Sequence, residues 1–376
     1  MDEEQHAMIY EMARRFSREV LAPGAARRER EKAIEPEVIQ GLAALGLLGM
    51  TVSPDYDGAG ADYVGYALAL MAVAEGDGSV STMMSVHNAP FCAVLERYGS
   101  AAQKEHVLRP AARGEFIGAF ALTESHAGSD AAAIRTRARR EPGHYVIDGE
   151  KQFITSGQIA GHVVVFAVTD PDGGKQGISA FLVPTDTPGY QVSKIEQKAG
   201  QKASDTCSLA FEGLRLPADA LIGREGEGYR IALSSLEAGR IGIAAQSVGM
   251  AQAALDAAIA YAQERSSFGK SLMDHQAVAF RLADARARLE AARQLVLSAA
   301  RLKDAGKPAL QQACMAKLVA SETAEQVCSA ALQTFGGYGY VEDFPVERIW
   351  RDARVCQIYE GTSDIQKIIL AKGLQQ

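Results

Sequence analysis

Residues 278–302, VAFRLADARARLEAARQLVLSAARL, place an apolar side chain at every third or fourth position, with charged side chains between them. In a helix of about 3.6 residues per turn, this spacing gathers the apolar side chains on one narrow face. A similar spacing recurs over residues 316–334. Long antiparallel helices that each bury one narrow face are typical of a helical bundle. We therefore expect residues 226–376 to form a C-terminal helical bundle domain.

The segment before this bundle changes from helical to β patterning. Short apolar runs such as 162–169 (HVVVFAVT) and 178–183 (ISAFLV) are typical of strands. Asp148-Gly149 separates two further runs and predicts a tight hairpin turn, because glycine tolerates the positive φ that such a turn requires. Residues 113–225 are therefore expected to form a middle β domain, which ends in a glycine-rich joint, 223–228, that leads into a helix.

The first part of the chain is predicted to be helical. It is rich in alanine, leucine and glutamate with few turn signals, and Met8, Met12 and Phe16 recur at helical spacing. We therefore expect an N-terminal helical domain over residues 1–112.

The composition excludes several classes of function. The 376 residues carry a net charge of −7 and are 47% hydrophobic, which is ordinary for a globular protein and argues against a nucleic-acid partner. The five cysteines form no Cys-x-x-Cys pair, so we expect reduced core residues. The seven histidines show no metal-ligand spacing, and we expect no metal site.

The N-terminal sequence indicates a cytoplasmic protein. MDEEQHAMIYEMARRFSREV carries acidic residues where a signal peptide needs basic ones. The longest uninterrupted apolar runs are far shorter than a membrane span. We therefore expect no exported or membrane-anchored chain.

Two glycine-containing segments are candidates for ligand binding. Residues 120–130, FALTESHAGSD, read as a strand that runs into a small polar turn. Such a turn offers backbone N–H groups and hydroxyls to an anion or a planar heteroaromatic ring, although a solvated loop has the same composition. Residues 333–340, QTFGGYGY, carry three glycines where a helix C-cap needs only one, which indicates close approach of a ligand or of another backbone.

A third segment, IYEGTSDIQ (358–366), contains a candidate general base. Glu360 lies among apolar and aromatic neighbours just before a glycine, and a helix can begin after it with Thr362 or Ser363 as cap. Burial would raise the pKa of Glu360 towards the working range of a general base. The alternative is a carboxylate that only stabilises the start of the helix.

Three familiar catalytic patterns are absent or incomplete in the sequence. FGKS (268–271) ends like a phosphate-binding loop, but Glu264 stands where that motif needs its first glycine. Gly223, Gly226 and Gly228 do not have the spacing of a dinucleotide-binding fingerprint, and no Gly-x-Ser-x-Gly elbow occurs.

Taken together, the segments resemble the acyl-CoA dehydrogenase family of flavoproteins along essentially the whole chain. ALTESHAGSDAAA (121–133) is similar to the first signature of that family, and QTFGGYGYVEDFPVERIWRD (333–352) to its second, while IYEGTSDIQ lies at the expected distance from the C-terminus. The resemblance implies a mainly α fold with a β middle domain: an N-terminal helical domain, a β-barrel-like middle domain and a C-terminal four-helix bundle.

The resemblance also implies an activity. Family members are FAD-dependent enzymes that remove the α-proton of an acyl-CoA thioester while the β-hydride passes to flavin N5, which gives a trans-2-enoyl-CoA. Glu360 matches the catalytic base of short- and medium-chain members. Some members carry the base immediately before an arginine of the helix that follows the middle domain, but here Gly239 precedes Arg240.

Further site residues are implied by position in the family pattern. The expected FAD contacts are Phe120, Leu122, Thr123, Ser129, Phe153, Ile154, Thr155, Gln333, Gly336, Gly337, Thr362, Ser363 and Asp364. Arg265, Phe268 and Gln276 are expected to reach the FAD of a neighbouring subunit, Arg265 by meeting the pyrophosphate. The acyl-CoA is expected to contact Ser129, Glu237, Arg240 and Gly361. Phe153 and Ser156 depart from the tryptophan and asparagine common in the family.

LEAGRIGIAAQSVGMAQ (236–252) is most similar to short-chain, butyryl-type members, with short branched-chain members next. The resemblance implies electron transfer to an electron-transferring flavoprotein and a homotetramer built as a dimer of dimers. The absence of arginine at 78–81 favours a monocarboxylic acyl chain. The alternatives are a medium-chain or unusual acyl-CoA, an oxidase of the same fold that uses oxygen, and an assembly protein that kept only the fold. Glu360, Arg240 and Arg265 argue against the last.

Overall fold

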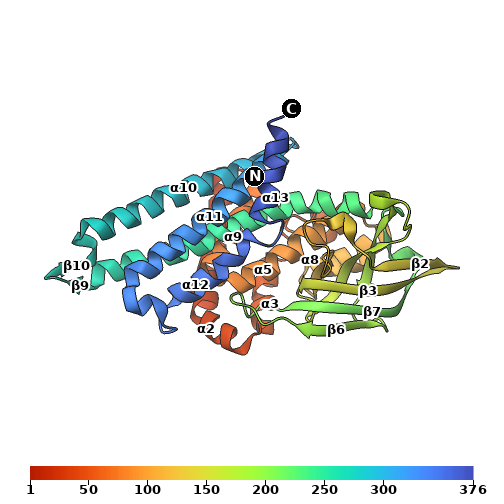
Figure 1. The fold of residues 1–376 in the computed structure, drawn as a ribbon, viewed down its shortest axis with the longest axis horizontal. Helices are drawn as coiled ribbons and strands as arrows, with labels where there is room; N and C mark the ends of the chain where they lie inside the picture. The colour runs from red at the N-terminus through yellow and green to blue at the C-terminus, as the bar shows by residue number, and fades with distance from the viewer. Residues whose placement is uncertain (376) are drawn as a thin grey trace.

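A helix of 37 residues, α9 (Gly228–Glu264), runs through the middle of the molecule (Figure 1). The computed structural model describes residues 1–375. Alanine and glycine are frequent in α9, and their small side chains let α4 (Tyr63–Gly76), α10 (Gln276–Asp304) and α11 (Leu310–Phe335) pack closely around it. By length and composition alone α9 could cross a membrane, but 67% of its apolar window is buried inside this chain, as in a core helix.

The C-terminal part confirms the two predicted apolar faces. Leu282, Leu289 and Val296 of α10 are buried, and so are Ala320 and Val327 of α11. After α11 the chain passes through η9 (Gly336–Tyr340) into α12 (Pro345–Arg354), η10 (Val355–Gln357) and α13 (Ser363–Gly373).

The N-terminal part is helical, as predicted. Besides α4 it contains α1 (Glu3–Phe16), η1 (Ser17–Leu21), α2 (Ala22–Glu31), α3 (Pro36–Ala44), α5 (Gly78–Val86), η3 (His87–Cys92), α6 (Ala93–Tyr98), α7 (Ala101–Gln103), η4 (Lys104–Leu108) and α8 (Arg109–Ala112). Side-chain caps fix several helix starts: Asp2 with Gln5 at α1, Asp62 at α4 and Asp77 at α5.

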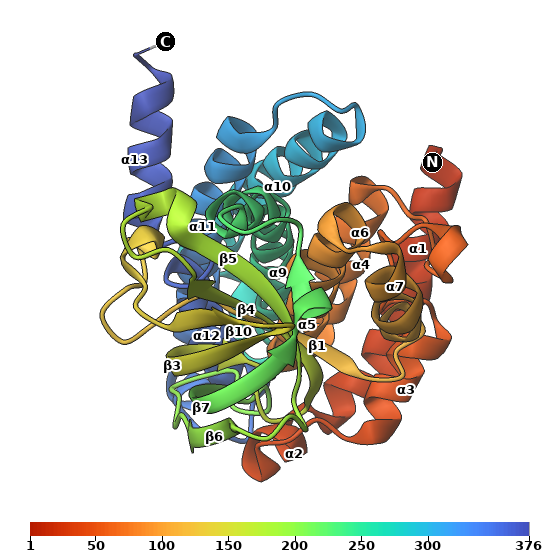
Figure 2. The same cartoon turned by 90° about the vertical axis from the view of Figure 1, so that its right-hand side faces the viewer.

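The middle part is one eight-stranded sheet that lies at one end of the molecule (Figure 1) and faces the viewer in Figure 2. Its order is β6-β7-β3-β2-β4-β5-β8, and β1 pairs with β4 in parallel. The strands are β1 (Ile117–Ala121), β2 (Arg137–Glu141), β3 (His144–Thr155), β4 (Ala160–Val168), β5 (Ile178–Pro184), β6 (Tyr190–Ile195), β7 (Thr206–Pro217) and β8 (Leu221–Ile222). The predicted fold class, mainly helical with a β middle part, is confirmed.

The prediction of a hairpin turn at Asp148-Gly149 is wrong. β3 continues through both residues, and Gly149 (φ +146°) lies at a register shift against β7. A Cβ on Gly149 would stand 2.7 Å from Cα of Thr136, so the glycine serves close approach of the chain rather than chain reversal. The reversal between β2 and β3 lies at Gly143, whose φ is +78°.

Two glycines of α9 provide a test of this packing. A Cβ on Gly249 would stand 2.1 Å from the backbone carbonyl oxygen of Met71 in α4, whereas one on Gly242 would stand 2.8 Å from Oγ of Ser85, a side-chain atom that can shift. We expect Gly249→Ala to destabilise the fold by about 1–3 kcal/mol, because two helix backbones must separate. Gly242→Ala should be close to neutral, since better helix propensity offsets the milder crowding. Urea unfolding measures both, and equal losses would contradict this assignment.

Candidate active site

Glu360 lies in a strained loop between η10 and α13. Its φ is +55° and that of Gly361 is +86°, so two consecutive residues adopt the left-handed conformation. For a residue other than glycine this conformation costs about 1–3 kcal/mol and persists only where the surroundings impose it. Thr362 then caps α13, as predicted, by accepting the N–H of Ile365 at 3.3 Å.

The carboxyl group of Glu360 points at a gap in α9. A Cβ on Gly239 would stand 1.7 Å from Oε1 of Glu360, so only glycine leaves room for the carboxyl group there. Although Glu360 as a whole is half-buried, its Oε1 is shielded from solvent and has no hydrogen-bond partner among residues 1–375. Burial raises the pKa of Glu360 to about 7, against the opposing effect of the positive charges of Arg240 and Lys317. This is the range in which a carboxylate can act as a general base at neutral pH.

The two α9 residues predicted to contact the acyl-CoA, Glu237 and Arg240, lie on the same turn of helix as Gly239. Arg240 is buried, and its Nε has no hydrogen-bond partner in the part of the chain that the structure describes. Glu237 accepts a hydrogen bond from Nζ of Lys303 on α10 at 2.7 Å. Burial raises the pKa of the Cys314 thiol on α11, and the charges of Arg240 and Glu237 also act on this thiol. Arg240 and Glu237 therefore lie near the contact between α9 and α11.

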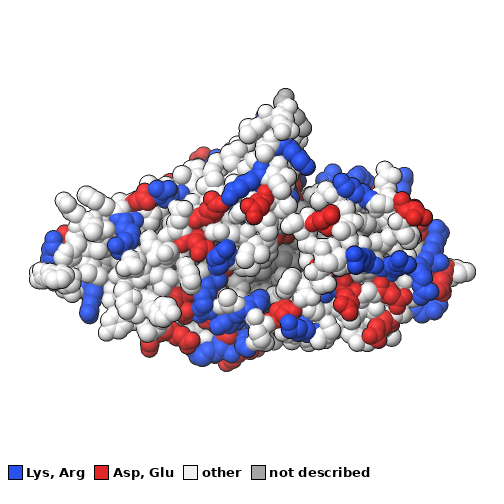
Figure 3. Space-filling model, in the orientation of Figure 1, with Lys and Arg blue, Asp and Glu red and all other residues white. Residues whose placement is uncertain are grey.

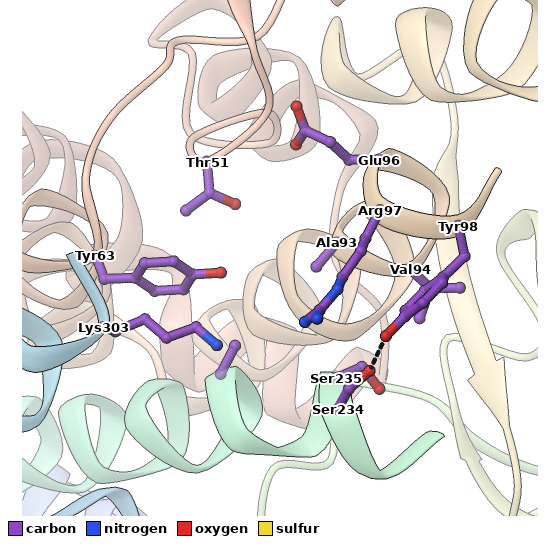
Figure 4. Close-up of a pocket in the computed structure, with 11 residues that line it drawn as sticks. Thr51, Tyr63, Ala93, Val94, Glu96, Arg97, Tyr98, Ser234, Ser235 and Lys303 are labelled. Atoms are coloured by element: carbon purple, nitrogen blue, oxygen red, sulfur yellow. Dashed lines mark hydrogen bonds between the residues drawn. The ribbon is translucent and has the colours of Figure 1, made fainter. Parts of the chain in front are cut away.

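A cavity of about 200 Å³ opens between α6, α9 and the end of α10 (Figure 4). Arg97 and Lys303 both extend towards it, and the hydroxyl groups of Tyr98 and Ser234 lie 2.8 Å apart at its edge. Ala238, next to Gly239, is part of its wall. None of the predicted site residues lines it directly.

Behind Glu360 a closed polar cluster joins α5, α9 and the loop before β7. Tyr359 donates from its hydroxyl to Oε1 of Gln246 at 2.6 Å and accepts from Nε2 of Gln201 at 3.2 Å. Gln246 donates in turn to Oγ of Ser81 at 2.8 Å, and Thr82 donates to Oε1 of Gln201 at 2.6 Å. Because Tyr359 precedes Glu360 directly, the cluster fixes one side of the base.

On the sheet side, the predicted turn at 120–130 is anchored by a fully buried lysine. Nζ of Lys151 donates to the carbonyl oxygen of Leu122 at 3.0 Å and to Oε1 of Glu124 at 2.8 Å. Burial lowers the pKa of Lys151 to about 8. The backbone N–H of Gln152 donates to the carbonyl oxygen of Thr123 at 2.8 Å. The turn is therefore held in one position against β3.

Two residues at the end of β3 have the geometry of a binding surface. Phe153 is 62% exposed at φ +59°, and Ser156 adopts φ +62° with a buried Oγ that has no partner. An exposed aromatic ring on a strained backbone next to an unpaired hydroxyl fits a planar polar ligand such as an isoalloxazine ring. Ser363 in the Glu360 loop likewise has a buried Oγ without a partner.

A second group of predicted FAD residues lies at the opposite end of the same chain. Arg265, Gly336 and Gly337 line a cavity of about 610 Å³ at the end of the helical part. Phe268, 97% exposed, lies beyond it at the turn between β9 (Ser266–Ser267) and β10 (Lys270–Ser271). In Figure 1 this hairpin and the sheet occupy opposite ends of the molecule. One chain therefore does not bring the two groups of residues together.

One face of the molecule carries charges of both signs. On the face seen in Figure 3, Lys and Arg are interspersed with Asp and Glu, and the surface is hollowed below α13, between the helical part and the sheet.

Sequence reasoning missed several members of the site. Lys317, Gln366 and Lys151 were not singled out, although each donates a hydrogen bond to a predicted residue. Tyr359, Gln246 and Gln201, which form the polar cluster next to Glu360, were not singled out either. Lys317 had a detectable signal, because it lies on the face of α11 that also carries Ala313, Ala316 and Ala320. A lysine on an apolar helix face is rarely there without a partner.

Comparison with known proteins gives consistent matches. Models of the acyl-CoA dehydrogenase N-terminal, middle and C-terminal domains match residues 3–115, 119–214 and 226–375. The mitochondrial short-chain specific acyl-CoA dehydrogenase of Bos taurus is 44% identical over 368 residues, which are 98% of this chain and 89% of that protein.

Among solved structures, butyryl-CoA dehydrogenase from Megasphaera elsdenii matches with a TM-score of 0.97 and 39% identity over 100% of both chains. A structure reported for the electron transferring flavoprotein of Acidaminococcus fermentans, in connection with flavin-based electron bifurcation, matches with a TM-score of 0.98 and 40% identity, again over 100% of both chains.

The burial of Glu360 predicts a pH-dependent stability difference. Its pKa of about 7 in the fold lies above the ordinary value of 4.5 that applies to the unfolded chain. Between pH 4.5 and about 7 the unfolded chain therefore releases this proton more readily than the folded protein, and the carboxyl group of the wild type costs stability as the pH rises, whereas the amide of Glu360→Gln does not. The stability of Glu360→Gln relative to wild type should therefore grow by about 3 kcal/mol between these pH values and then level off.

Urea unfolding of the two proteins across that range measures this difference. Glu342→Gln, which removes an exposed carboxylate, is the control and should show no such trend. A wild-type to Glu360→Gln difference that stays constant with pH would contradict the buried, shifted carboxyl group.

Proposed function

Because the chain belongs to the acyl-CoA dehydrogenase family and is an FAD-dependent acyl-CoA dehydrogenase, we propose that it oxidises a short-chain acyl-CoA to the trans-2-enoyl-CoA with Glu360 as base. One observation carries the assignment of the base. Oε1 of Glu360 is shielded, unpaired and aimed at the space that Gly239 leaves open. A carboxylate without a partner is available to take a proton.

The residues of the chain fit FAD. The exposed ring of Phe153, the unpaired Oγ of Ser156 and the anchored turn at Leu122 and Thr123 suit the ring system. Arg265 and the glycines of η9 suit the pyrophosphate and the adenosine. When bound, FAD supplies the acceptor for the hydride of the β-carbon.

The residues of this chain account for the proton transfer. Glu360 must be ionised to remove the α-proton, so activity is expected to rise with pH through its pKa of about 7. We assign the backbone N–H of Glu360 to the thioester oxygen, where negative charge develops as the proton leaves. Arg240 and Glu237 lie along the path of the acyl-CoA. The strained loop fixes the direction of the carboxyl group.

The polar cluster beside Glu360 supports a short acyl group. Gln246, Tyr359, Gln201 and Thr82 fill the space between α5 and α9 with mutually satisfied hydrogen bonds. A long apolar chain directed into this space would leave these buried groups unpaired, which is costly. A medium-chain or unusual acyl-CoA is the alternative.

The two distant groups of FAD residues support an assembly of several copies. We assign Arg265, Phe268 and Gln276 of one copy to the FAD held by the sheet of another, in a homotetramer built from dimers. Similarity to a chain in a structure reported for an electron transferring flavoprotein supports such a flavoprotein as the electron acceptor. Transfer to oxygen, as in an oxidase of the same fold, is the alternative. We place the enzyme in a bacterial cytoplasm.

Anaerobic titration with acyl-CoA thioesters tests this function. We expect butyryl-CoA or isobutyryl-CoA to bleach the visible flavin absorbance of the wild type faster than octanoyl-CoA does. Glu360→Gln should bind FAD normally and lose reduction by about 10²-fold or more, because no base remains. Bleaching by octanoyl-CoA alone would remove the short-chain assignment, and full turnover of Glu360→Gln would remove the base.

Gly239→Ala tests the orientation of the base without touching its chemistry. The added methyl group would overlap Oε1 of Glu360, so the carboxyl group must turn away. We expect a loss of reduction rate approaching that of Glu360→Gln, with FAD content unchanged, because misplacement by about 1 Å can cost 10²-fold. Ala238→Gly, which changes the same turn of α9 without adding an atom beside Oε1 of Glu360, is the control and should keep most of the reduction rate. A fully active Gly239→Ala enzyme would show that Glu360 acts from another position.

A further inference from the structure

We propose that Lys317 and Gln366 are positioning residues for the proposed base: together they clamp the carbonyl group of Gly361, and the charge of Lys317 keeps the Glu360 carboxylate ionised at working pH. This inference rests on the proposed role of Glu360. Lys317 lies outside the sequence motifs, and Gln366, the last residue of IYEGTSDIQ (358–366), has no assigned role in them.

The clamp consists of two donors on one carbonyl oxygen. Nζ of Lys317 on α11 donates to the oxygen of Gly361 at 2.7 Å, and Nε2 of Gln366 on α13 donates to the same oxygen at 2.8 Å. Both side chains are fully buried. Since a carbonyl oxygen has two lone pairs, its acceptor capacity is filled. The Gly361–Thr362 peptide plane, one residue beyond the base, is therefore fixed from two different helices.

The backbone of Glu360 needs such a restraint. Left to itself, a glutamate avoids the left-handed conformation that it adopts here at φ +55°. The cap of Thr362 fixes the start of α13, and the polar cluster at Tyr359 fixes the residue before the base. Between these two fixed points, Lys317 and Gln366 hold the loop at the Gly361 carbonyl.

Lys317 is more than a hydrogen-bond donor. A neutral carbonyl group does not compensate for burying a full positive charge, and burial lowers the pKa of Lys317 to about 8. The titratable groups that act on it are Cys356, Glu360, Arg240 and Cys314. Glu360 is the only carboxylate among these, so it is the counter-charge that favours a protonated Lys317. By reciprocity, Lys317 favours an ionised Glu360.

Two matched variants separate the clamp from the charge. Lys317→Met and Gln366→Met each remove one donor to Gly361 and keep an unbranched side chain of similar length, but only the first removes a charge. The experiment measures anaerobic flavin reduction by butyryl-CoA against pH in the FAD-loaded wild type and both variants. An infrared titration follows the carboxyl band of Glu360, identified by its absence from Glu360→Gln, and reads the charge effect without turnover.

We expect both variants to reduce the flavin about tenfold more slowly, because the base is less well aligned. Of these two variants, Lys317→Met alone should also move the midpoint of the acidic limb of the pH profile, and the midpoint of the infrared titration, to a pH about one unit higher. Lys317→Gln, which keeps an N–H donor without the charge, should recover part of the rate but not the pH position.

The outcomes are distinct. Wild-type rates in both methionine variants would overturn the clamp, and an unshifted infrared titration in Lys317→Met would overturn the charge effect. If Lys317→Met does not fold, Gln366→Met decides the clamp and Lys317→Gln decides the charge. A wild-type enzyme that no thioester reduces would overturn the proposed function instead, while the infrared titration would still test the charge of Lys317.

Discussion

The Oε1 atom of Glu360 is held out of water without a hydrogen-bond partner, and much of the surrounding structure follows from that constraint. Burial alone would leave the carboxyl group protonated at neutral pH. Two buried cations, Arg240 on α9 and Lys317 on α11, oppose this effect, while Gly239 clears the space in front of the oxygen. The central helix thus supplies both a charge and a gap, and its packing against α11 decides whether the base can work.

At the sheet end, a buried ion pair plays a similar anchoring role. The ion pair of Glu124 and Lys151 is shielded from solvent. Removing one partner of a buried ion pair costs far more stability than removing one partner of a surface pair. The pair of Glu124 and Lys151 ties the turn after β1 to β3, the strand that also carries the exposed Phe153. Rigid anchoring of a loop that meets a ligand reduces the ordering required on binding.

Much of this arrangement could be read from the sequence, for reasons that are local. The apolar faces of α10 and α11 follow from helical periodicity, and the cap at Thr362 follows from its side chain. At Gly149 local reasoning failed, because a glycine needed for chain reversal and one needed for close approach to another strand look alike in one dimension. The role of Lys317 could not be predicted for a related reason: a lysine on an apolar face is visible in the sequence, but its partner, the Gly361 carbonyl, is a backbone atom 44 residues away.

The placement of the β9–β10 hairpin at the end opposite the sheet has a genetic consequence. In the proposed assembly each cofactor is completed by residues of two copies, so a lesion at the hairpin harms the neighbour's site rather than its own. Co-expression of one subunit damaged at the hairpin with another damaged at the sheet would reconstitute some intact sites. Two inactive alleles could therefore complement each other within a single mixed oligomer.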